Sequence, residues 1–318
     1  MKKSLLILGA SGLTGSKAMQ IGTRRFETFG TYNLRKVKDR DMIKLDVTDE
    51  DSLAKIISEI KPDFLLNATA LHNVDYCESH PDESFKVNAH AVGTIAKICN
   101  KIGARMVHIS TDYVFDGNKK QYYTEEDKPN PQSVYAKSKL KGESFARNAN
   151  SYCVLRSSVI YGWTSSEAPD AISSSGKPMN FVLWALNKMS KNEKLTMVRD
   201  QLTTPTLADE LASVAIRLCT VSKEMNGIFH VAGTSCVSRY DFALQIAKIM
   251  GHPRNLIRSI ETKELVQVAK RPMQSCLSSD KVQEKLGIQL PDVQQSLFIM
   301  RSQMEVEAPS LLGTHLRL

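Results

Sequence analysis

The chain has 318 residues, and its 42% apolar and 24% charged content is typical of a globular protein rather than a disordered or collagen-like one. Lysines and arginines number 42 against 34 aspartates and glutamates, and the net charge of +8 is scattered along the chain, so nucleic-acid binding is not expected. Apolar runs such as residues 181–186 fall far short of the ~18 residues that a membrane span needs, so no membrane insertion is expected.

The six cysteines show no Cys-x-x-Cys spacing, which argues against a metal cluster and against a disulfide framework. They are Cys77, Cys99, Cys153, Cys219, Cys236 and Cys276. The apolar run at residues 4–8 is too short for a signal peptide, and glycines interrupt the chain directly afterwards. Both observations favour a protein of the reducing cytoplasm that holds no metal.

The first half of the chain alternates short apolar runs with longer amphipathic segments. Strands are predicted at residues 4–8, 28–32, 42–45, 64–67, 105–110 and 153–160. Helices are predicted at residues 15–26, 51–60, 81–103 and 135–148. This alternation predicts βαβ units, and the continuously apolar strands predict a parallel sheet with helices on both faces.

The amino-acid composition changes after Gly162. Residues 163–177 are rich in Ser, Pro, Ala and Gly, which predicts a long loop. Further helices are predicted at residues 180–191, 207–220 and 238–250, and further strands at residues 195–198 and 227–232. The last of these helices has Ser238 as its expected N-cap and Gly251 as its expected C′ residue. Residues 305–318 form a tail for which the sequence suggests no function.

Three glycines join the first predicted strand to the first predicted helix in the pattern G-x-x-G-x-x-G, at Gly9, Gly12 and Gly15. Such a loop lets a diphosphate approach the backbone and meet the free N–H groups at the start of the helix. A plain tight turn would use the same residues. The position of the loop after the first strand of a βαβ series favours dinucleotide binding.

The end of the second predicted strand bears on the choice of dinucleotide. Enzymes that bind NAD often place an acidic residue there to bind the ribose 2′-hydroxyl. This sequence has Asn33 and Arg35 instead, and Arg35 could pair with a 2′-phosphate. The alternative is that Arg35 is merely exposed. We therefore expect NADPH, with NADH still possible.

Tyr135 and Lys139 stand four residues apart, so on a helix they share one face. A phenol titrates near 10, and a nearby ammonium is expected to lower that pKa. Tyr135 could then give a proton to a carbonyl oxygen as hydride reaches the carbon. The alternative is a packed tyrosine beside an exposed lysine.

Thr111 lies at the carboxyl end of the fifth predicted strand, where doubly wound sheets bind their ligands. Its hydroxyl could donate a hydrogen bond to the same carbonyl oxygen that Tyr135 protonates. The alternative is a threonine that only caps the end of its strand.

The glycine loop, the run from Ser110 to Gly117 (STDYVFDG) and the Tyr135-x-x-x-Lys139 pair together resemble the extended short-chain dehydrogenase/reductase superfamily. Within it, the sequence is most similar to the dTDP-4-dehydrorhamnose reductase branch. Further motifs match that branch: residues 123–131, residues 67–70 with His72, Val74, Asp75 and Glu78, Asn88, Gln201, Pro205-Thr206 and Arg271-Pro272. The resemblance extends to about residue 290. Ala136 departs from the glycine that is usual after the tyrosine.

The resemblance implies a catalytic triad of Thr111, Tyr135 and Lys139. The residues expected to contact the cofactor are Gly9, Ser11, Gly12, Leu13, Gly15, Asn33, Arg35, Asp46, Val47, Ala68, Thr69, Ala70, Tyr135 and Lys139. The residues expected to contact the substrate are His72, Val74, Asp112, Tyr113 and Arg271. His72 alone could equally be a loop histidine, and Asp75 and Glu78 could equally cap a helix.

The expected fold is α/β, with a Rossmann-type doubly wound parallel sheet and a smaller α/β substrate-binding domain. Residues 1–162 and about 202–233 would build the first, and about 163–201 with 234–318 would build the second. The implied reaction is NAD(P)H-dependent reduction of the 4-keto group of a nucleotide-linked deoxysugar. The alternatives are a dinucleotide-binding regulatory subunit, similar to that of methionine adenosyltransferase, and a nucleotide-sugar epimerase or dehydratase. A homodimer is expected only by analogy with the family.

Overall fold

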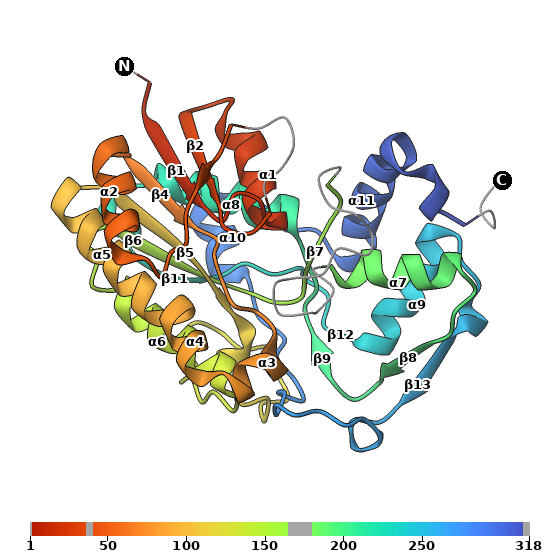
Figure 1. Ribbon diagram of the computed structural model, residues 1–318. Helices are drawn as coiled ribbons and strands as arrows, with labels where there is room; N and C mark the ends of the chain where they lie inside the picture. Colours follow the sequence, from red (N-terminus) through yellow and green to blue (C-terminus); the bar gives the residue numbers. More distant parts are fainter. Residues whose placement is uncertain (1, 36–40, 165–179, 314–318) are drawn as a thin grey trace.

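The computed structural model describes residues 2–35, 41–164 and 180–313. Its centre is a seven-stranded sheet in the order β11-β6-β5-β4-β1-β2-β3, and every neighbouring pair is parallel (Figure 1). The strands are β1 (Ser4–Leu8), β2 (Glu27–Tyr32), β3 (Ile43–Lys44), β4 (Phe64–Asn67), β5 (Arg105–Thr111), β6 (Tyr152–Ser157) and β11 (Gly227–His230). Because β1 lies inside the sheet and later strands extend it in both directions, the predicted Rossmann-type doubly wound fold is confirmed.

Helices cover both faces of the sheet, and alternate residues of β1 show why. Leu5 and Ile7 belong to the apolar core on the face of α1 (Leu13–Gly22) and α8 (Ala208–Cys219). Leu6 and Leu8 belong to the core on the opposite face. The helices packed there are α2 (Glu50–Ile60), α5 (Ala91–Ile102) and α6 (Val134–Ala146). This first lobe, the sheet with its covering helices, therefore buries every β1 side chain from Leu5 onward, as a continuously apolar strand requires.

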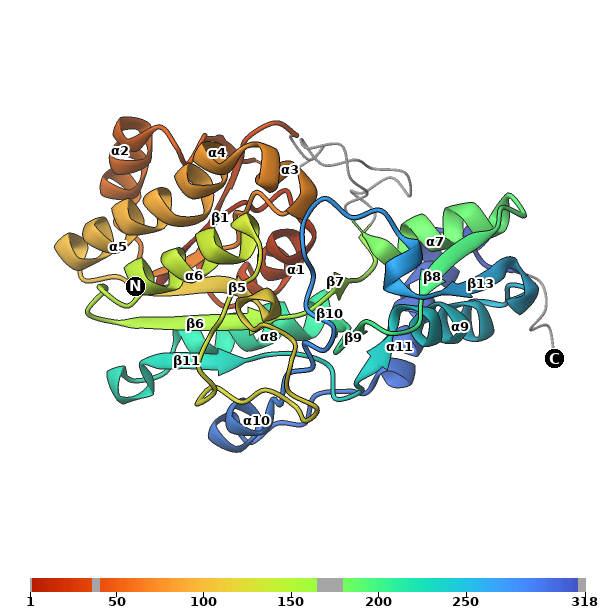
Figure 2. The same ribbon diagram turned by 90° about the horizontal axis from the view of Figure 1, so that it is seen from below.

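A second lobe lies beyond the carboxyl ends of the sheet strands (Figure 2). It consists of α7 (Phe181–Ser190), α9 (Arg239–Met250), α11 (Val293–Glu307) and the parallel pair β8 (Leu195–Val198) and β13 (Ile257–Ile260). These helices share a separate apolar core. Ser238 caps α9 by accepting a hydrogen bond from the Asp241 N–H, and Gly251 ends it in the left-handed conformation, as predicted.

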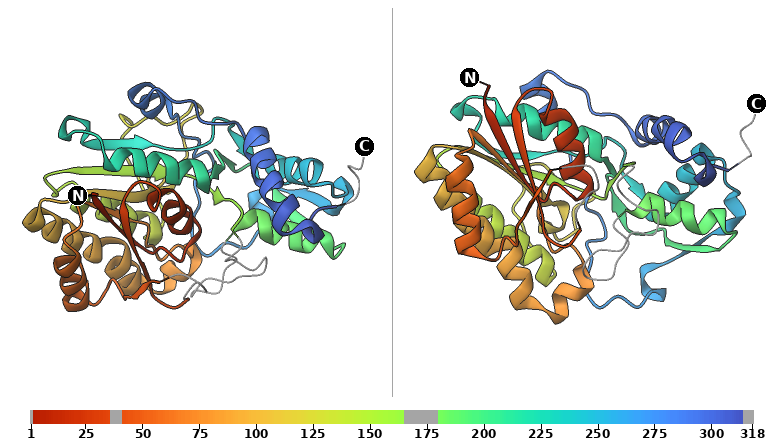
Figure 3. Two further views of the ribbon diagram at one scale, coloured as in Figure 1. Left: turned by 90° about the horizontal axis from the view of Figure 1, so that it is seen from above. Right: turned by 45° about the horizontal axis from the view of Figure 1, so that its top comes forward.

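Short elements connect the two lobes. They are β7 (Ile160–Tyr161) paired with β10 (Thr206–Leu207), and β9 (Leu202–Thr203) paired with β12 (Val237–Ser238). The remaining helices are α3 (Val74–Ser79), α4 (Pro81–Phe85) and α10 (Asp280–Leu286), with the short helices η1 (Lys86–His90), η2 (Asp112–Val114), η3 (Lys223–Met225), η4 (Arg254–Leu256), η5 (Thr262–Glu264) and η6 (Pro309–Leu311). Helix α10 packs on β11 in the first lobe, and α11 lies against the rest of the second lobe (Figure 3).

Two expectations from the sequence are wrong, and a third is refined. The predicted helix at 81–103 runs without a break as α4, η1 and α5, and η1 is a π-helical turn whose Asn88 carbonyl packs against Gly142 of α6. The predicted strand at 153–160 ends at Ser157, and Val159 adopts a φ of 42° before β7 leaves the central sheet. Cys236 and Cys276 form a disulfide between segments 40 residues apart, which a search for local spacing does not detect.

The structure describes parts of the predicted loop at 163–177 and of the expected tail at 305–318. In the predicted loop, Trp163 is buried and its indole N–H donates to Glu307 at the end of α11. Residues 165–177 of that loop lie outside the described residues. The expected tail begins inside α11 and continues into η6. No described helix combines the length and the apolar character needed to cross a bilayer.

Candidate active site

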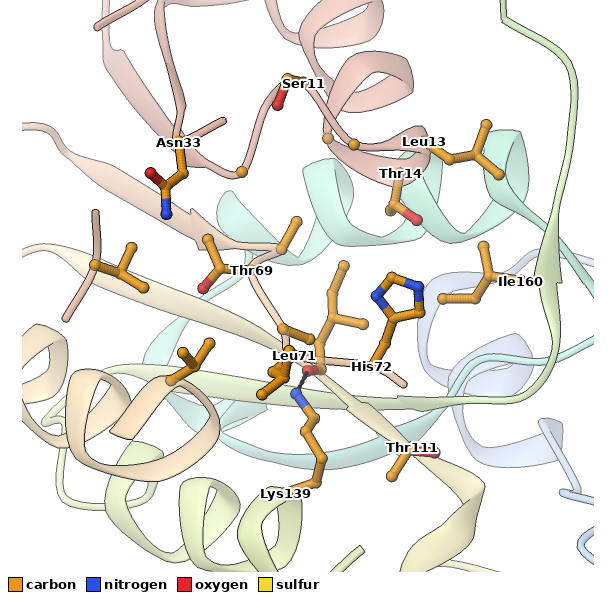
Figure 4. A pocket seen from close by; sticks show the side chains of 18 of the residues that line it. Ser11, Leu13, Thr14, Asn33, Thr69, Leu71, His72, Thr111, Lys139 and Ile160 are labelled. Carbon is orange, nitrogen blue, oxygen red and sulfur yellow. Dashed lines mark hydrogen bonds between the residues drawn. The ribbon is translucent and has the colours of Figure 1, made fainter. Parts of the chain in front are cut away.

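A cavity of about 660 Å³ opens at the carboxyl ends of β1, β2, β4 and β5. Figure 4 shows side chains that converge on it from separate elements, among them Ser11, Thr69, His72, Thr111 and Lys139. All fourteen predicted cofactor contacts line this cavity, as do Thr111, His72 and Asp112. The cavity therefore joins the glycine loop to the predicted triad.

The glycine loop is shaped by contacts that a side chain would block. Gly9 has a φ of 78°, a left-handed conformation that favours glycine. A Cβ at Gly15 would overlap the Gly9 carbonyl oxygen, whereas a Cβ at Gly12 would lie 3.4 Å from that oxygen. No side chain caps α1, whose N-cap is Gly12, so its first N–H groups are left to a ligand in the cavity.

Arg35 follows β2 and is held beside the glycine loop. Its guanidinium donates a hydrogen bond of 2.9 Å to the Ser11 carbonyl oxygen, and it lines the cavity with Asn33. The interpretation of Arg35 as a merely exposed side chain is therefore wrong. A cation at this place suits a phosphate on the 2′ position of a ribose.

The loop after β4 forms another wall of the cavity. Asn67 accepts hydrogen bonds from the backbone N–H and hydroxyl of Thr69, which fixes the course of the chain towards His72. The side chain of Asn88 binds both the N–H and the carbonyl of Leu71. The π-helical turn η1 thus supplies the residue that holds this wall.

Lys139 lies inside the protein, 2% exposed, on the second turn of α6. Its ammonium donates a hydrogen bond of 2.6 Å to the Ile109 carbonyl oxygen, the contact dashed in Figure 4. Burial lowers the pKa of Lys139 to about 8, and the negative charge of Glu143 opposes that shift. Near neutral pH the group is still mostly a cation.

Tyr135 is half-buried at the start of α6, where Ser133 caps the helix and Glu78 accepts a hydrogen bond from the Val134 N–H. Burial raises the pKa of Tyr135 above its ordinary value, and a hydrogen bond with the Thr111 side chain opposes the increase. The expected lowering of this pKa is not observed, because desolvation outweighs the favourable contacts. The phenol therefore keeps its proton at neutral pH, as a proton donor must.

Glu143 of α6 connects this helix to the neighbouring strands β5 and β6. Its carboxylate accepts two hydrogen bonds from Arg156, at 2.9 and 2.8 Å, and one of 2.6 Å from the Ser110 hydroxyl. Both charged side chains are 2% exposed. Because a buried pair of this kind is costly to break, it fixes the helix that holds Tyr135 and Lys139 against β5 and β6.

Three predicted substrate contacts do not line the cavity, namely Val74, Tyr113 and Arg271. The Arg271 guanidinium pairs with both carboxylate oxygens of Asp75, at 2.5 and 2.7 Å. Tyr113 lies edge-on to the ring of Tyr135 and forms a hydrogen bond with Arg239 of α9. Arg239 was not predicted, because nothing in the sequence brings α9 next to Tyr113 of η2.

Other lining residues were also missed by the sequence analysis. They include Thr14, Thr31, Leu45, Leu71, Val87, Ser157, Val159 and Ile160. Most are apolar or small side chains next to residues that were predicted. The only signal in the sequence that could have indicated them is their place at or near the end of a predicted strand. Among the described residues, no group of three or more histidine, cysteine or carboxylate side chains is placed to bind a metal.

Comparison with known proteins agrees with this geometry. Residues 1–305 match the family described as "RmlD substrate binding domain". The chain belongs to this family. An RmlD-family relative from Aggregatibacter actinomycetemcomitans, named dTDP-4-dehydrorhamnose reductase, is 33% identical over 95% of this chain and 99% of its own length.

Solved structures with the same name are also similar. A dTDP-4-dehydrorhamnose reductase from Bacillus anthracis, in complex with NADP, has a TM-score of 0.83 and is 26% identical, covering 95% of this chain and 100% of its own. An orthologue from Clostridium acetobutylicum has a TM-score of 0.81 and is 31% identical, covering 95% and 99%. The RmlD-family assignment thus extends over nearly the whole chain in sequence and in fold.

Proposed function

We propose that this chain is an NADPH-dependent oxidoreductase that reduces the 4-keto group of a nucleotide-linked deoxysugar, as dTDP-4-dehydrorhamnose reductases do. The observation that carries this proposal is that one cavity is lined both by the glycine loop and by Thr111, Tyr135 and Lys139. The names of the RmlD-family relatives, and the NADP complex of one of them, point to the same chemistry.

The cavity fits a dinucleotide with a 2′-phosphate. The uncapped start of α1 and the bare backbone at Gly12 would receive the diphosphate. Arg35 would meet the 2′-phosphate, and Asp46 with Val47 would line the adenine side. Residues 68–70 would follow the path to the nicotinamide ribose, which Lys139 would hold. NADPH, when bound, supplies the hydride.

Side chains of this protein would donate the proton that the reduction needs. Tyr135 holds a proton on its phenol oxygen and would donate it to the keto oxygen of the sugar. Thr111 would orient that oxygen from the end of β5. Lys139, still cationic at neutral pH, would favour the phenolate left after the proton has moved. The apolar wall formed by Leu71, Val87 and Ile160 would limit the access of water.

The substrate would lie between the two lobes, on the His72 side of the cavity. His72 and Asp112 line it directly, whereas Val74, Tyr113 and Arg271 do not. Basic side chains and helix N-termini near the cleft would bind the nucleotide diphosphate. We further propose a cytoplasmic homodimer that acts without nucleic-acid or membrane partners. The Cys236–Cys276 disulfide removes the cysteine pattern as an argument for a reducing compartment.

The test is a direct assay with purified protein, NADPH and dTDP-4-dehydro-6-deoxy-L-mannose. We expect stoichiometric loss of NADPH absorbance and a larger thermal shift with NADPH than with NADH, because a ligand that binds only the folded state stabilises it. Cofactor binding without turnover on any nucleotide sugar, together with recovery of a partner synthetase, would support the regulatory-subunit alternative. NAD that survives dialysis would support an epimerase or dehydratase.

A further inference from the structure

Asn67 and His108 are neighbours on two central strands, and both side chains are fully buried. Asn67 ends β4, His108 lies within β5, and the register of the two parallel strands pairs them directly. The Asn67 amide nitrogen lies 3.2 Å from Nδ1 of the His108 ring. Neither residue lines the cavity, so any role that they have in binding a ligand is indirect.

The chemistry of their partners fixes how these two side chains are oriented. The Thr69 backbone N–H can only donate, so the Asn67 atom that it binds at 3.1 Å is the amide oxygen. The amide nitrogen of Asn67 therefore faces His108, and because this nitrogen only donates, Nδ1 must accept. Nδ1 consequently carries no proton, and the neutral imidazole carries its proton on Nε2.

The other side of the His108 ring has no such bond. Nε2 finds no hydrogen-bond partner among the described residues, although a buried N–H without a partner destabilises the folded state. It lies beside α6, where a Cβ at Gly142 would be 3.6 Å from it. Burial, and then the positive charge of Lys139, lower the pKa of His108 well below its ordinary value, so the ring is neutral. An apolar side chain would fill this space without an unpaired N–H. The feature that distinguishes histidine here is therefore the acceptor at Nδ1.

The Asn67 amide links this acceptor to the cavity. Its oxygen accepts hydrogen bonds from the Thr69 N–H at 3.1 Å and from the Thr69 hydroxyl at 2.6 Å, which fixes the turn from β4 into residues 68–70. Thr69 and its neighbours line the cavity (Figure 4), and Thr69 and Ala68 also pack closely against Gly9 of the glycine loop. If the amide rotated by half a turn, its nitrogen would face the Thr69 N–H and this bond would be lost. The bond to His108 keeps the oxygen on the Thr69 side.

We propose that His108 is a positioning residue for the cofactor, acting through the Asn67 amide to hold residues 68–70 in the conformation that receives the nicotinamide ribose. This inference rests on the proposed function for the identity of the cofactor. It gives His108 no contact with the cofactor, the substrate or the reacting atoms. The task of the neutral ring is to accept one hydrogen bond.

The experiment compares His108→Leu with His108→Asn. The two new side chains have the same branched shape, but only asparagine places an oxygen near the position of Nδ1. Fluorescence titration should show that His108→Leu binds NADPH about threefold to tenfold more weakly than the wild type, the effect of one hydrogen bond, whereas His108→Asn stays within about twofold. In His108→Leu the KM for NADPH should rise, while kcat at saturating NADPH stays close to that of the wild type. Equal affinities in the two variants, whether both preserved or both weakened, would overturn the proposal.

His252→Leu is the matched control. His252 is a buried histidine of the second lobe, and its Nε2 contacts the Leu311 carbonyl. This variant should bind NADPH as the wild type does, because no contact leads from His252 to residues 68–70. A loss of affinity as large as that of His108→Leu would show a general effect of removing a buried histidine and would contradict the proposal.

A double-mutant cycle tests the route through the amide. In the Asn67→Ala background, His108→Leu should cause no further loss of NADPH affinity, since the amide on which His108 acts is already absent. Losses that add in the double variant would show that His108 acts by another route and would overturn the positioning role.

A measurement on the wild-type protein needs no folded variant of reduced affinity and no turnover. Long-range ¹H–¹⁵N correlation spectra of protein with ¹⁵N-labelled histidine, with the His108 signals assigned by their loss in His108→Asn, should show a proton on Nε2 and none on Nδ1. A proton on Nδ1 would contradict the inference. If the wild type binds NADPH but reduces no sugar nucleotide, the proposed function fails, while the affinities and these signals still decide the role of His108.

Discussion

The ammonium of Lys139 is stabilised in the folded protein by the Ile109 carbonyl and by the charge of Glu143, but its burial is the larger effect and lowers its pKa to about 8. In the unfolded chain the group titrates near 10.5. The folded protein therefore binds fewer protons than the unfolded chain between these two values. Stability attributable to Lys139 must rise with pH across that window and be lowest below it.

Comparison of the wild-type protein with Lys139→Met tests this at the residue scale. From pH 7 to 10.5, the free energy of unfolding of the wild type should increase relative to the variant by about 3 kcal/mol, from a shift of roughly two and a half pKa units. Urea titrations at both pH values measure the difference, and the variant corrects for other titrating groups. Parallel pH profiles for the two proteins would show that Lys139 is not buried as a cation.

At the scale of elements, the turn from β1 into α1 contains two glycines with different roles. Gly15 has no space for a Cβ because the Gly9 carbonyl oxygen occupies it, whereas Gly12 has an ordinary φ of −78° and a Cβ there would lie 3.4 Å from that oxygen. Gly15 is thus required by the fold of the turn. Gly12 is required only if a ligand approaches the backbone at that point.

Alanine at each position separates these roles. Gly15→Ala should lower the free energy of unfolding by about 2 kcal/mol or more, because the backbone must move to relieve the overlap. Gly12→Ala should change it by less than about 1 kcal/mol and yet weaken NADPH binding at least tenfold, since the new methyl group meets the diphosphate. Chemical denaturation and fluorescence titration with NADPH measure the two effects. Unimpaired binding by Gly12→Ala would place the cofactor elsewhere.

Elements whose cause is local could be predicted from the sequence. The strands β1, β4 and β8, the cap of α9 at Ser238 and the glycine loop depend on neighbouring residues alone. The π-helical turn has no local signal in the sequence, and its Asn88 carbonyl packs against Gly142 of α6, a contact between segments far apart in the chain. The early end of β6 also has a tertiary cause, since β7 pairs with β10 instead of with the central sheet.

At the scale of the whole molecule, the cavity residues of the first lobe could be predicted from the sequence. The contacts that residues 202–276 make with the site could not. The glycine loop, Thr111, Tyr135 and Lys139 have recognisable spacing and were identified with the fold. Ser275 approaches Asp112 across 163 residues, and the disulfide joins segments 40 residues apart. No periodicity in the sequence encodes such contacts, which depend on how the two lobes pack.

The most direct test of the account is the rate of reduction by Tyr135→Phe at saturating NADPH and dTDP-4-dehydro-6-deoxy-L-mannose. The account predicts a kcat at least ~100-fold below that of the wild type, because the variant lacks the proton that the keto oxygen must receive. NADPH affinity and the unfolding midpoint should be preserved, since the phenyl ring still fills its half-buried place on α6. A Tyr135→Phe protein that reduces the sugar at the wild-type rate would contradict the claim that Tyr135 donates the proton.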